Sequence, residues 1–179
     1  LPFSRYMELA LYAPGLGYYA AGSRKLGADG DFITAPEISP LFGRCLARQC
    51  AQVLQILGEG DILEFGAGTG RMAAEILLTL DRLGTLPGAY HILEPSPDLR
   101  ERQRSQLSAL PLELRGRVRW LDSLPEAGSF RGVMLGNEVL DAMPVRVFRW
   151  TGEAVMERGI AMEQGRGLCW QDRPADPGL

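Results

Sequence analysis

The stretch that decides the fold runs from Asp61 to Arg71 and reads DILEFGAGTGR. Its first five residues form a short apolar run typical of a buried strand, and three glycines at alternate positions follow at once. Because glycine has no Cβ, it tolerates a positive φ and lets a ligand approach the backbone closely. A helix that begins at Thr69 or Gly70 would point its free N–H groups at that ligand. The pattern predicts a binding loop between a strand and a helix.

Strand and helix signals alternate on both sides of this loop. Ser39-Pro40 and Ser96-Pro97 each combine an N-cap residue with proline in the first helical turn, which marks the start of a helix. We expect strands over 61–65, 90–93, 118–121 and 132–135, and helices over 40–57, 70–83 and 97–107. The β–α–β–α order predicts an α/β fold, with a Rossmann-like parallel sheet covered by helices on both faces.

The two ends of the chain differ from this central part. Residues 1–36 begin with an amphipathic helix from Phe3 to Leu11 and continue into a glycine-rich loop, and we expect this segment to cover a bound cofactor. Residues 37–144 form the nucleotide-binding half-domain. Residues 145–179 alternate with period two, which predicts an antiparallel meander that begins a substrate-side insertion and ends in a linker from Asp172.

Composition excludes several classes of protein. The chain has 179 residues and a net charge of −3, from 19 Lys and Arg against 22 Asp and Glu. This balance argues against a protein that grips nucleic acid, because such affinity comes mainly from clustered basic residues. The most apolar stretch, from Leu41 to Leu57, is interrupted by Arg44 and Arg48, so we expect no membrane span. We also expect no signal peptide, because the first residues lack the basic-then-apolar order.

Cysteine and histidine usage argue against metal and hydrolase chemistry. The chain has only three cysteines, without a CxxC motif, and its one histidine, His91, lies in a predicted buried strand. A zinc site would have too few ligands at the required spacing, so we expect no metal. A serine or cysteine hydrolase would need His91 as its base, and a satisfied core histidine is the better interpretation.

Two classes of nucleotide ligand fit the glycine loop. Glu94 ends the next predicted strand, twenty-four residues after Gly70, where a carboxylate can accept both hydroxyls of a ribose. Residues 68–73 satisfy the G-x-G-x-x-A fingerprint of dinucleotide-binding proteins. Glu64 and the three glycines instead give E-x-G-x-G-x-G, the loop associated with S-adenosylmethionine. A carboxylate at Glu64 suits that cation and would repel a diphosphate.

The ends of the third and fourth predicted strands also carry polar residues. Asp122 could bond an adenine amino group or cap a turn. Asn137 and Glu138 follow a buried strand, where polar groups are costly unless they face a ligand or each other. If Glu138 opens a short helix, Asp141 lies one turn along on the same face. Two carboxylates placed in this way could hold a cationic acceptor.

Several motifs in order resemble one family. They are TAPEIS with the preceding GDFI at residues 30–39, the glycine loop, GNEVLDAMP at 136–144, and YAPGLGYY at 12–19. Together these motifs resemble the MidA-like methyltransferases, which include the mitochondrial arginine methyltransferase that assists assembly of respiratory complex I. The resemblance implies a class I methyltransferase fold, S-adenosylmethionine as methyl donor, and a protein arginine as acceptor. It also implies a location in the bacterial cytoplasm or the mitochondrial matrix.

The resemblance and the strand ends together suggest the site residues. For the cofactor we expect the residues of the glycine loop, the acids that end the next two strands, and a further wall from the TAPEIS segment: Glu64, Gly66, Ala67, Gly68, Gly70, Glu94, Asp122, Thr34 and Ser39. For catalysis we expect Asn137, Glu138 and Asp141. A non-catalytic assembly factor with a vestigial pocket and an NAD(P)-dependent oxidoreductase are the alternatives.

The family's sheet has more strands than this chain provides. A class I methyltransferase has seven, and only four parallel strands followed by a meander are evident here. We therefore expect an incomplete sheet that exposes the apolar flank of its fourth strand, from a chain that represents part of a longer protein.

Overall fold

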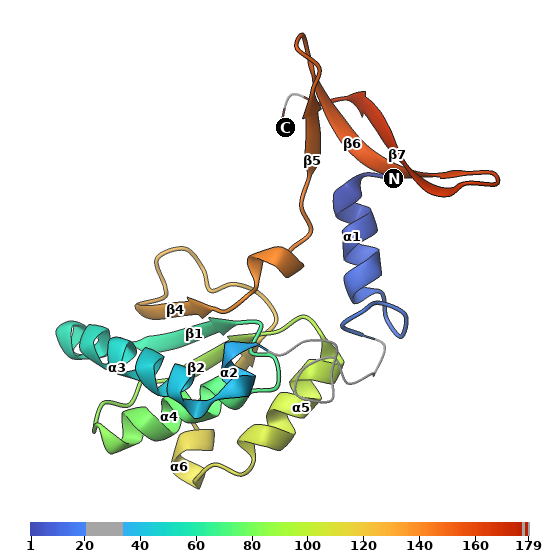
Figure 1. Ribbon diagram of the computed structural model, residues 1–179. Coiled ribbons are helices and arrows are strands. Elements are labelled where there is room, and N and C mark those ends of the chain that lie inside the picture. The colour runs from blue at the N-terminus through green and yellow to red at the C-terminus, as the bar shows by residue number, and fades with distance from the viewer. Residues whose placement is uncertain (21–33, 177, 179) are drawn as a thin grey trace. The chain divides into compact units, whose positions relative to one another are not determined.

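The computed structural model describes residues 1–20, 34–176 and 178. These residues form two compact units. The larger unit falls within Gly22–Val139 and contains a parallel sheet with its helices, whereas the smaller combines residues of Leu1–Ala21 and Leu140–Leu179 and contains an antiparallel sheet (Figure 1). The predicted glycine-rich loop up to residue 31 and the first four residues of the 30–39 motif lie outside the described residues.

The larger unit is built on four parallel strands, and the four predicted strands are confirmed. They are β1 (Asp61–Phe65), β2 (Tyr90–Leu93), β3 (Val118–Leu121) and β4 (Gly132–Gly136). The strand order is β3-β2-β1-β4, so β2 and β4 flank β1. Phe65 is level with Leu93 on one side and with Gly136 on the other. The direction of winding reverses between β1 and β4, and in such sheets ligands bind outside the carboxyl ends of the strands at this point.

The helices of the larger unit lie on one side of the sheet (Figure 1). They are α2 (Ala35–Ile38), α3 (Pro40–Leu57), α4 (Arg71–Arg82), α5 (Pro97–Leu107) and α6 (Leu112–Arg115). The prediction of helices on both faces is therefore wrong for the described residues. The crossovers through α4 and α5 advance in the same direction, and right-handed crossovers in one direction place their helices on one face. The return from β3 to β4 reverses direction, but residues 122–131 contain no helix.

The core of this unit lies between the sheet and that helical layer. Ile62, Tyr90 and Ile92 on the sheet are fully buried against α3 and α4, and burial of each such side chain contributes roughly 1.5–3 kcal/mol. Cys50 on α3 belongs to this core, and burial raises the pKa of its thiol to about 11. On the edge strand β4, Met134 is 55% exposed, which confirms the expected apolar flank of the fourth strand.

The smaller unit is a three-stranded meander with one helix packed on it. Its strands β5 (Val147–Trp150), β6 (Val155–Glu163) and β7 (Gly167–Pro174) pair in sequence order, and α1 (Phe3–Tyr12) contacts β6. Both the meander and the helix were predicted and are confirmed. The predicted linker from Asp172 is wrong over its first residues, because β7 continues to Pro174.

Ion pairs explain that extension of β7. Asp172 accepts a hydrogen bond from Arg158 Nε at 2.8 Å, and Arg173 Nε donates to Glu157 Oε2 at 2.9 Å. These bonds connect β7 to β6.

Among the helices of the described residues, none combines the length and apolar character needed to cross a bilayer.

Candidate functional site

The glycine loop connects the carboxyl end of β1 to the first turn of α4. Gly66, Gly68 and Gly70 all adopt positive φ angles, of 60°, 54° and 87°, which side chains disfavour. A hydrogen bond from the Gly66 N–H to the Leu93 carbonyl fixes the loop to β2. A Cβ on Gly70 would lie 3.3 Å from the Cα of Gln103, so the glycine allows close packing between the loop and α5.

Glu64, the acidic residue of the loop motif, is buried on the helical side of the sheet. Its side chain is 1% exposed, and the Tyr90 hydroxyl donates a hydrogen bond to Glu64 Oε2 at 2.6 Å. Burial raises the pKa of Glu64 to about 7, the Tyr90 bond opposes this shift, and the charge of Glu94 adds to it. Burial also raises the pKa of Tyr90, so its hydroxyl remains a donor. A positive ligand near Glu64 would favour its ionised form.

This buried carboxyl makes the free energy of unfolding depend on pH. The folded state holds the Glu64 proton more tightly than the unfolded chain, with a pKa of about 7 against 4.5, so stability is greatest below the lower value and falls as pH rises through the higher one. We expect a loss of about 3 kcal/mol between about pH 4.5 and 8 without ligand. Urea unfolding across this range measures the loss, and Glu64→Gln should flatten the profile. A profile that Glu64→Gln leaves unchanged would contradict this assignment.

Glu94 follows β2 beside the loop and is held from two directions. Its side chain is 3% exposed; Oε1 accepts the Ser96 N–H at 3.0 Å, and Oε2 accepts Gln103 Nε2 at 3.2 Å. Burial raises the pKa of Glu94, while the bonds from Ser96 and Gln103 and the charge of Arg100 lower it. A carboxylate has about four acceptor positions, so two remain for ligand hydroxyls.

Asp122, at the end of β3, is held by an arginine of α5. Arg100 Nη1 donates to Asp122 Oδ1 at 2.7 Å, and its other nitrogens donate to the carbonyls of Glu94 and Leu121. The Asp122 side chain is 90% exposed. Arg100 therefore joins the carboxyl ends of β2 and β3, and the predicted bond from Asp122 to an adenine stays a prediction.

The TAPEIS segment reaches the glycine loop through a residue that the sequence did not assign to the site. Glu37 on α2 accepts a hydrogen bond from the Thr69 hydroxyl at 2.5 Å, and its carbonyl accepts Arg71 Nη1 at 2.9 Å. Ser39 caps α3, because its Oγ accepts the Leu41 N–H at 3.2 Å. Thr34 is half-buried ahead of α2. Roles for Ser39 and Thr34 in cofactor binding stay predictions.

The polar residues after β4 are only partly arranged as expected. Glu138 has a φ of 52° and is the one described non-glycine residue with a positive φ. It does not open a helix, so the condition for placing Asp141 one turn along on the same face is not met; the short 3₁₀ helix η1 (Leu140–Ala142), which contains Asp141, begins two residues later. Asn137 is half-buried. The Val139 side chain lies 3.4 Å from the place of a Cβ on Gly66, so residues 136–139 turn back beside the glycine loop.

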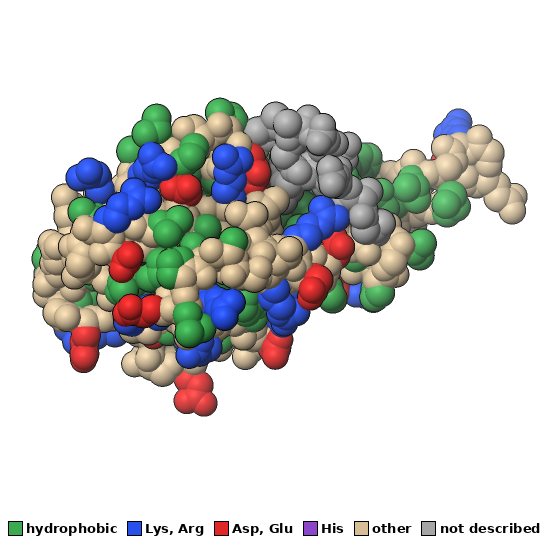
Figure 2. All heavy atoms as spheres, turned by 90° about the horizontal axis from the view of Figure 1, so that it is seen from below, with side chains coloured by type: hydrophobic (Ala, Val, Ile, Leu, Met, Phe, Trp, Pro, Cys, Tyr) green, Lys and Arg blue, Asp and Glu red, His purple; other side chains and the backbone are tan. Residues whose placement is uncertain are grey.

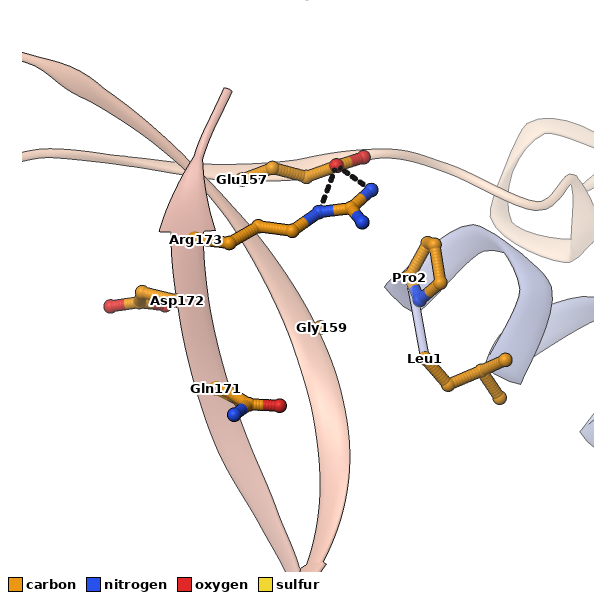
Figure 3. Close-up of a pocket in the computed structure, with 7 residues that line it drawn as sticks. All are labelled: Leu1, Pro2, Glu157, Gly159, Gln171, Asp172 and Arg173. Atoms are coloured by element: carbon orange, nitrogen blue, oxygen red, sulfur yellow. Dashed lines mark hydrogen bonds and ion pairs between the residues drawn. The ribbon is translucent and has the colours of Figure 1, made fainter. Parts of the chain in front are cut away.

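A cavity of about 280 Å³ lies in the smaller unit, and Figure 3 shows its lining. Leu1 and Pro2 face β6 and β7 across it, and the ion pair between Glu157 and Arg173 closes one side. None of the predicted cofactor or catalytic residues lines this cavity. The buried Glu157 carboxylate is paired with both Arg173 and Arg146. We therefore interpret this cavity as part of the packing of the meander.

Charged side chains on the helical side of the larger unit are mixed in sign (Figure 2). Arg44 pairs with Glu75 between α3 and α4, and Arg102 pairs with Asp98 along α5. Pairing of this kind is typical of a solvated helical surface. Among the described residues, no three His, Cys, Asp or Glu side chains gather as metal ligands would.

Sequence reasoning missed the polar residues that connect the strand ends. Gln103, Arg100, Tyr90 and Glu37 all bond predicted site residues or the glycine loop. Glu37 could have been found from the sequence, because the helix cap at Ser39 accounts for Ser39-Pro40 but gives no reason for a glutamate at position 37. Gln103 and Arg100 had none, because polar residues on a helix ordinarily face solvent.

The chemistry of the loop fits a nucleoside that carries positive charge. Three of the five loop residues are glycines without a Cβ, and two buried carboxyls, Glu64 and Glu94, each lie beside the loop. Because the charge of Glu94 raises the pKa of Glu64, a cation would relieve their repulsion and a diphosphate would add to it. The residues present therefore fit S-adenosylmethionine better than a dinucleotide.

Comparison with known proteins gives matches over most of the chain. Residues 45–178 match the family model Methyltransf_28, described as "Putative S-adenosyl-L-methionine-dependent methyltransferase". A solved structure of a COG1565 superfamily member from Burkholderia thailandensis, bound to S-adenosyl-homocysteine, is 49% identical with a TM-score of 0.86 and covers 98% of this chain and 46% of that chain.

Two curated relatives are proteins of animal mitochondria. The protein arginine methyltransferase NDUFAF7 homolog, mitochondrial, of Caenorhabditis elegans is 27% identical over 93% of this chain and 44% of the relative. The protein arginine methyltransferase NDUFAF7, mitochondrial, of Danio rerio is 30% identical over 83% of this chain and 40% of the relative. The chain therefore spans less than half the length of these relatives.

Proposed function

Because the chain belongs to the S-adenosyl-L-methionine-dependent methyltransferase family whose model it matches over residues 45–178, we propose that it binds this cofactor in an enzyme that methylates arginine on a protein. The carrying observation is the glycine loop with the buried carboxylate of Glu94 beside it. Family membership argues against the dinucleotide alternative, and so do Glu64 and Glu94, whose carboxyls would repel a diphosphate.

The proposed cofactor contacts follow from the arrangement of the strand ends. Glu94 accepts ribose hydroxyls at its two remaining acceptor positions, and the glycine loop lies along the ligand without steric hindrance. Glu64 supplies negative charge behind the loop, and Asp122 and Thr34 are the further contacts proposed for the cofactor. When bound, S-adenosylmethionine would supply a methyl group on positively charged sulfur: the sulfur–methyl bond would break as the bond to the acceptor nitrogen forms, leaving a neutral thioether, and the proton lost by that nitrogen would pass to water.

The proposed acceptor is arginine because both its chemistry and the relatives favour it. The two NDUFAF7 relatives are protein arginine methyltransferases. A guanidinium stays protonated in proteins, which makes its nitrogens poor nucleophiles. A carboxylate at Glu138, with Asn137 preceding it, would hold the guanidinium by charge-assisted bonds and draw positive charge away from the attacking nitrogen. A catalytic role for Asp141 stays a prediction. Glu138 lies on the turn beside the glycine loop, which supports this role.

Calorimetry with the chain tests the cofactor assignment. We expect S-adenosylmethionine and S-adenosyl-homocysteine to bind with micromolar affinity and NAD to give no binding heat. Binding of NAD in preference to both would refute the assignment, because the same loop cannot favour the cation and the diphosphate equally.

Methyl transfer in the intact protein tests the acceptor. With a radiolabelled methyl donor, we expect label on an arginine-bearing protein or peptide and none on a matched peptide with lysine in place of arginine. Cofactor binding without transfer to any acceptor would favour the non-catalytic assembly factor. The two animal relatives are named as mitochondrial, which supports a mitochondrial location for a eukaryotic source. The mitochondrial matrix and, for a bacterial source, the cytoplasm stay predictions.

A further inference from the structure

Gln103 is a polar side chain with no exposed surface. It lies on α5 and is bonded to the ends of three strands. Its Nε2 donates to the Gly68 carbonyl at 3.0 Å and to Glu94 Oε2 at 3.2 Å, and its Oε1 accepts Trp120 Nε1 at 2.9 Å. A buried polar group of this kind is costly unless every bond is made, and here the amide bonds all three partners.

The chemistry of the partners allows only one orientation of this amide. A carbonyl and a carboxylate only accept hydrogen bonds, and the indole N–H only donates. The amide nitrogen must therefore face Gly68 and Glu94, and the amide oxygen must face Trp120. Among neutral side chains of similar size, only an amide can donate to two acceptors and accept from the indole at the same time.

We propose that Gln103 is a positioning residue for the cofactor site: it fixes the Glu94 carboxylate and the Gly68 carbonyl in the orientation that the ligand meets. This inference rests on the proposed function, because it requires Glu94 and the loop to bind the cofactor. Gln103 acts through these two groups. In this role it keeps two acceptor positions of Glu94 free and turned toward the ribose, while the N–H bond to Oε2 stabilises the ionised carboxylate.

Other groups also act on the Glu94 carboxylate. The Ser96 N–H bonds Oε1, Arg100 of α5 lowers the pKa of Glu94 through its charge, and Glu64 of β1 repels it. On β3, Asp122 is paired with Arg100. The Gln103 side chain hydrogen-bonds both Glu94 and the glycine loop.

The first test replaces the amide with an apolar side chain of similar length. Gln103→Met should weaken binding of S-adenosylmethionine by roughly 10- to 100-fold in calorimetry, since a bond to a charged group is lost. Leu107→Ala, a buried residue of the same helix, serves as the control for lost stability, and Gln106→Met serves as the control for the chemical change. Both controls should bind within about threefold of the parent. If Gln103 had a merely structural role, Leu107→Ala would bind S-adenosylmethionine as weakly as Gln103→Met.

The second test measures how affinity depends on pH. A merely structural role of Gln103 would not produce the pH dependence expected here. In Gln103→Glu the introduced carboxyl still accepts from Trp120, but when ionised it repels Glu94 and the Gly68 carbonyl; when protonated it can donate to one of them. The affinity deficit relative to the parent should therefore shrink as pH falls from about 8 to about 5.5. Gln106→Glu should show a deficit that does not change with pH. An unchanging deficit in Gln103→Glu would overturn the proposal.

Glu94→Gln separates failure of this inference from failure of the proposed function. If Glu94→Gln loses affinity while Gln103→Met binds like the parent, the positioning role is refuted and the site stands. If neither substitution changes affinity for S-adenosylmethionine, the proposed site itself is wrong. Gln103→Glu retains the Trp120 bond, so it remains informative if Gln103→Met does not fold.

Discussion

Gly68→Val is expected to abolish binding of S-adenosylmethionine, with a loss of affinity of at least about a hundredfold. Gly68 has a φ of 54° at the centre of the loop. A β-branched side chain there must either adopt a strained left-handed backbone, at a cost of roughly 1–3 kcal/mol, or move the loop. Either outcome alters the loop that the proposed ligand would cover.

A matched control separates this effect from backbone strain alone. Gly84 follows the end of α4 with a φ of 65°, and a Cβ there would meet no atom within 4 Å. Gly84→Val should therefore lose a similar amount of stability in urea unfolding while binding the ligand normally. If Gly68→Val binds within about threefold of the parent, the glycine loop does not hold the cofactor.

Glu138→Gln is expected to reduce methyl transfer by about a thousandfold or more, because a carboxylate that stabilises developing charge is lost. Affinity for S-adenosylmethionine should change by less than about threefold, since the proposed role concerns the acceptor. Rates of methyl transfer in the intact protein, together with calorimetry, measure the two effects. Glu126→Gln, which changes an exposed glutamate of the loop before β4, should leave both unaltered.

The backbone at Glu138 adds a second expectation with the opposite sign. Its φ of 52° is unfavourable for a residue with a side chain, so Glu138→Gly should raise the free energy of unfolding by about 1 kcal/mol. Turnover should still be lost. Retained turnover in Glu138→Gln would refute the proposed role, and a less stable Glu138→Gly would show that the left-handed backbone carries no strain.

Local signals predicted the elements well because short-range chemistry determines them. The predicted helix starts at Ser39-Pro40 and Ser96-Pro97 are confirmed, since both serine side chains cap their helices. The first two strands have the predicted bounds, because each is a short apolar run that Gly66 or Glu94-Pro95 ends, which leaves little choice of boundary. The order of these elements then predicted the α/β class, and the family resemblance narrowed it to a class I methyltransferase fold.

Longer-range features could not be predicted in the same way. Which face of the sheet a helix covers depends on the direction in which successive crossovers advance. The order of elements along the chain does not specify that direction. The extension of β7 to Pro174 depends on partners for Asp172 and Arg173 in β6. The bonds of Gln103 connect residues that are up to 35 positions apart, so no local pattern distinguishes this glutamine from exposed ones.

The two thiols of α3 provide a means of following the opening of the helical layer. A thiol reacts through its thiolate, and Cys50 is 2% exposed with its pKa raised to about 11. Cys45 on the same helix is exposed, and Cys169 belongs to the other unit. Alkylation of Cys45 should therefore proceed in the native state, whereas alkylation of Cys50 waits for α3 to separate from the sheet. The alkylation rate of Cys50 therefore measures how often α3 separates from the parallel sheet. Alkylation of Cys169 reports on the smaller unit instead.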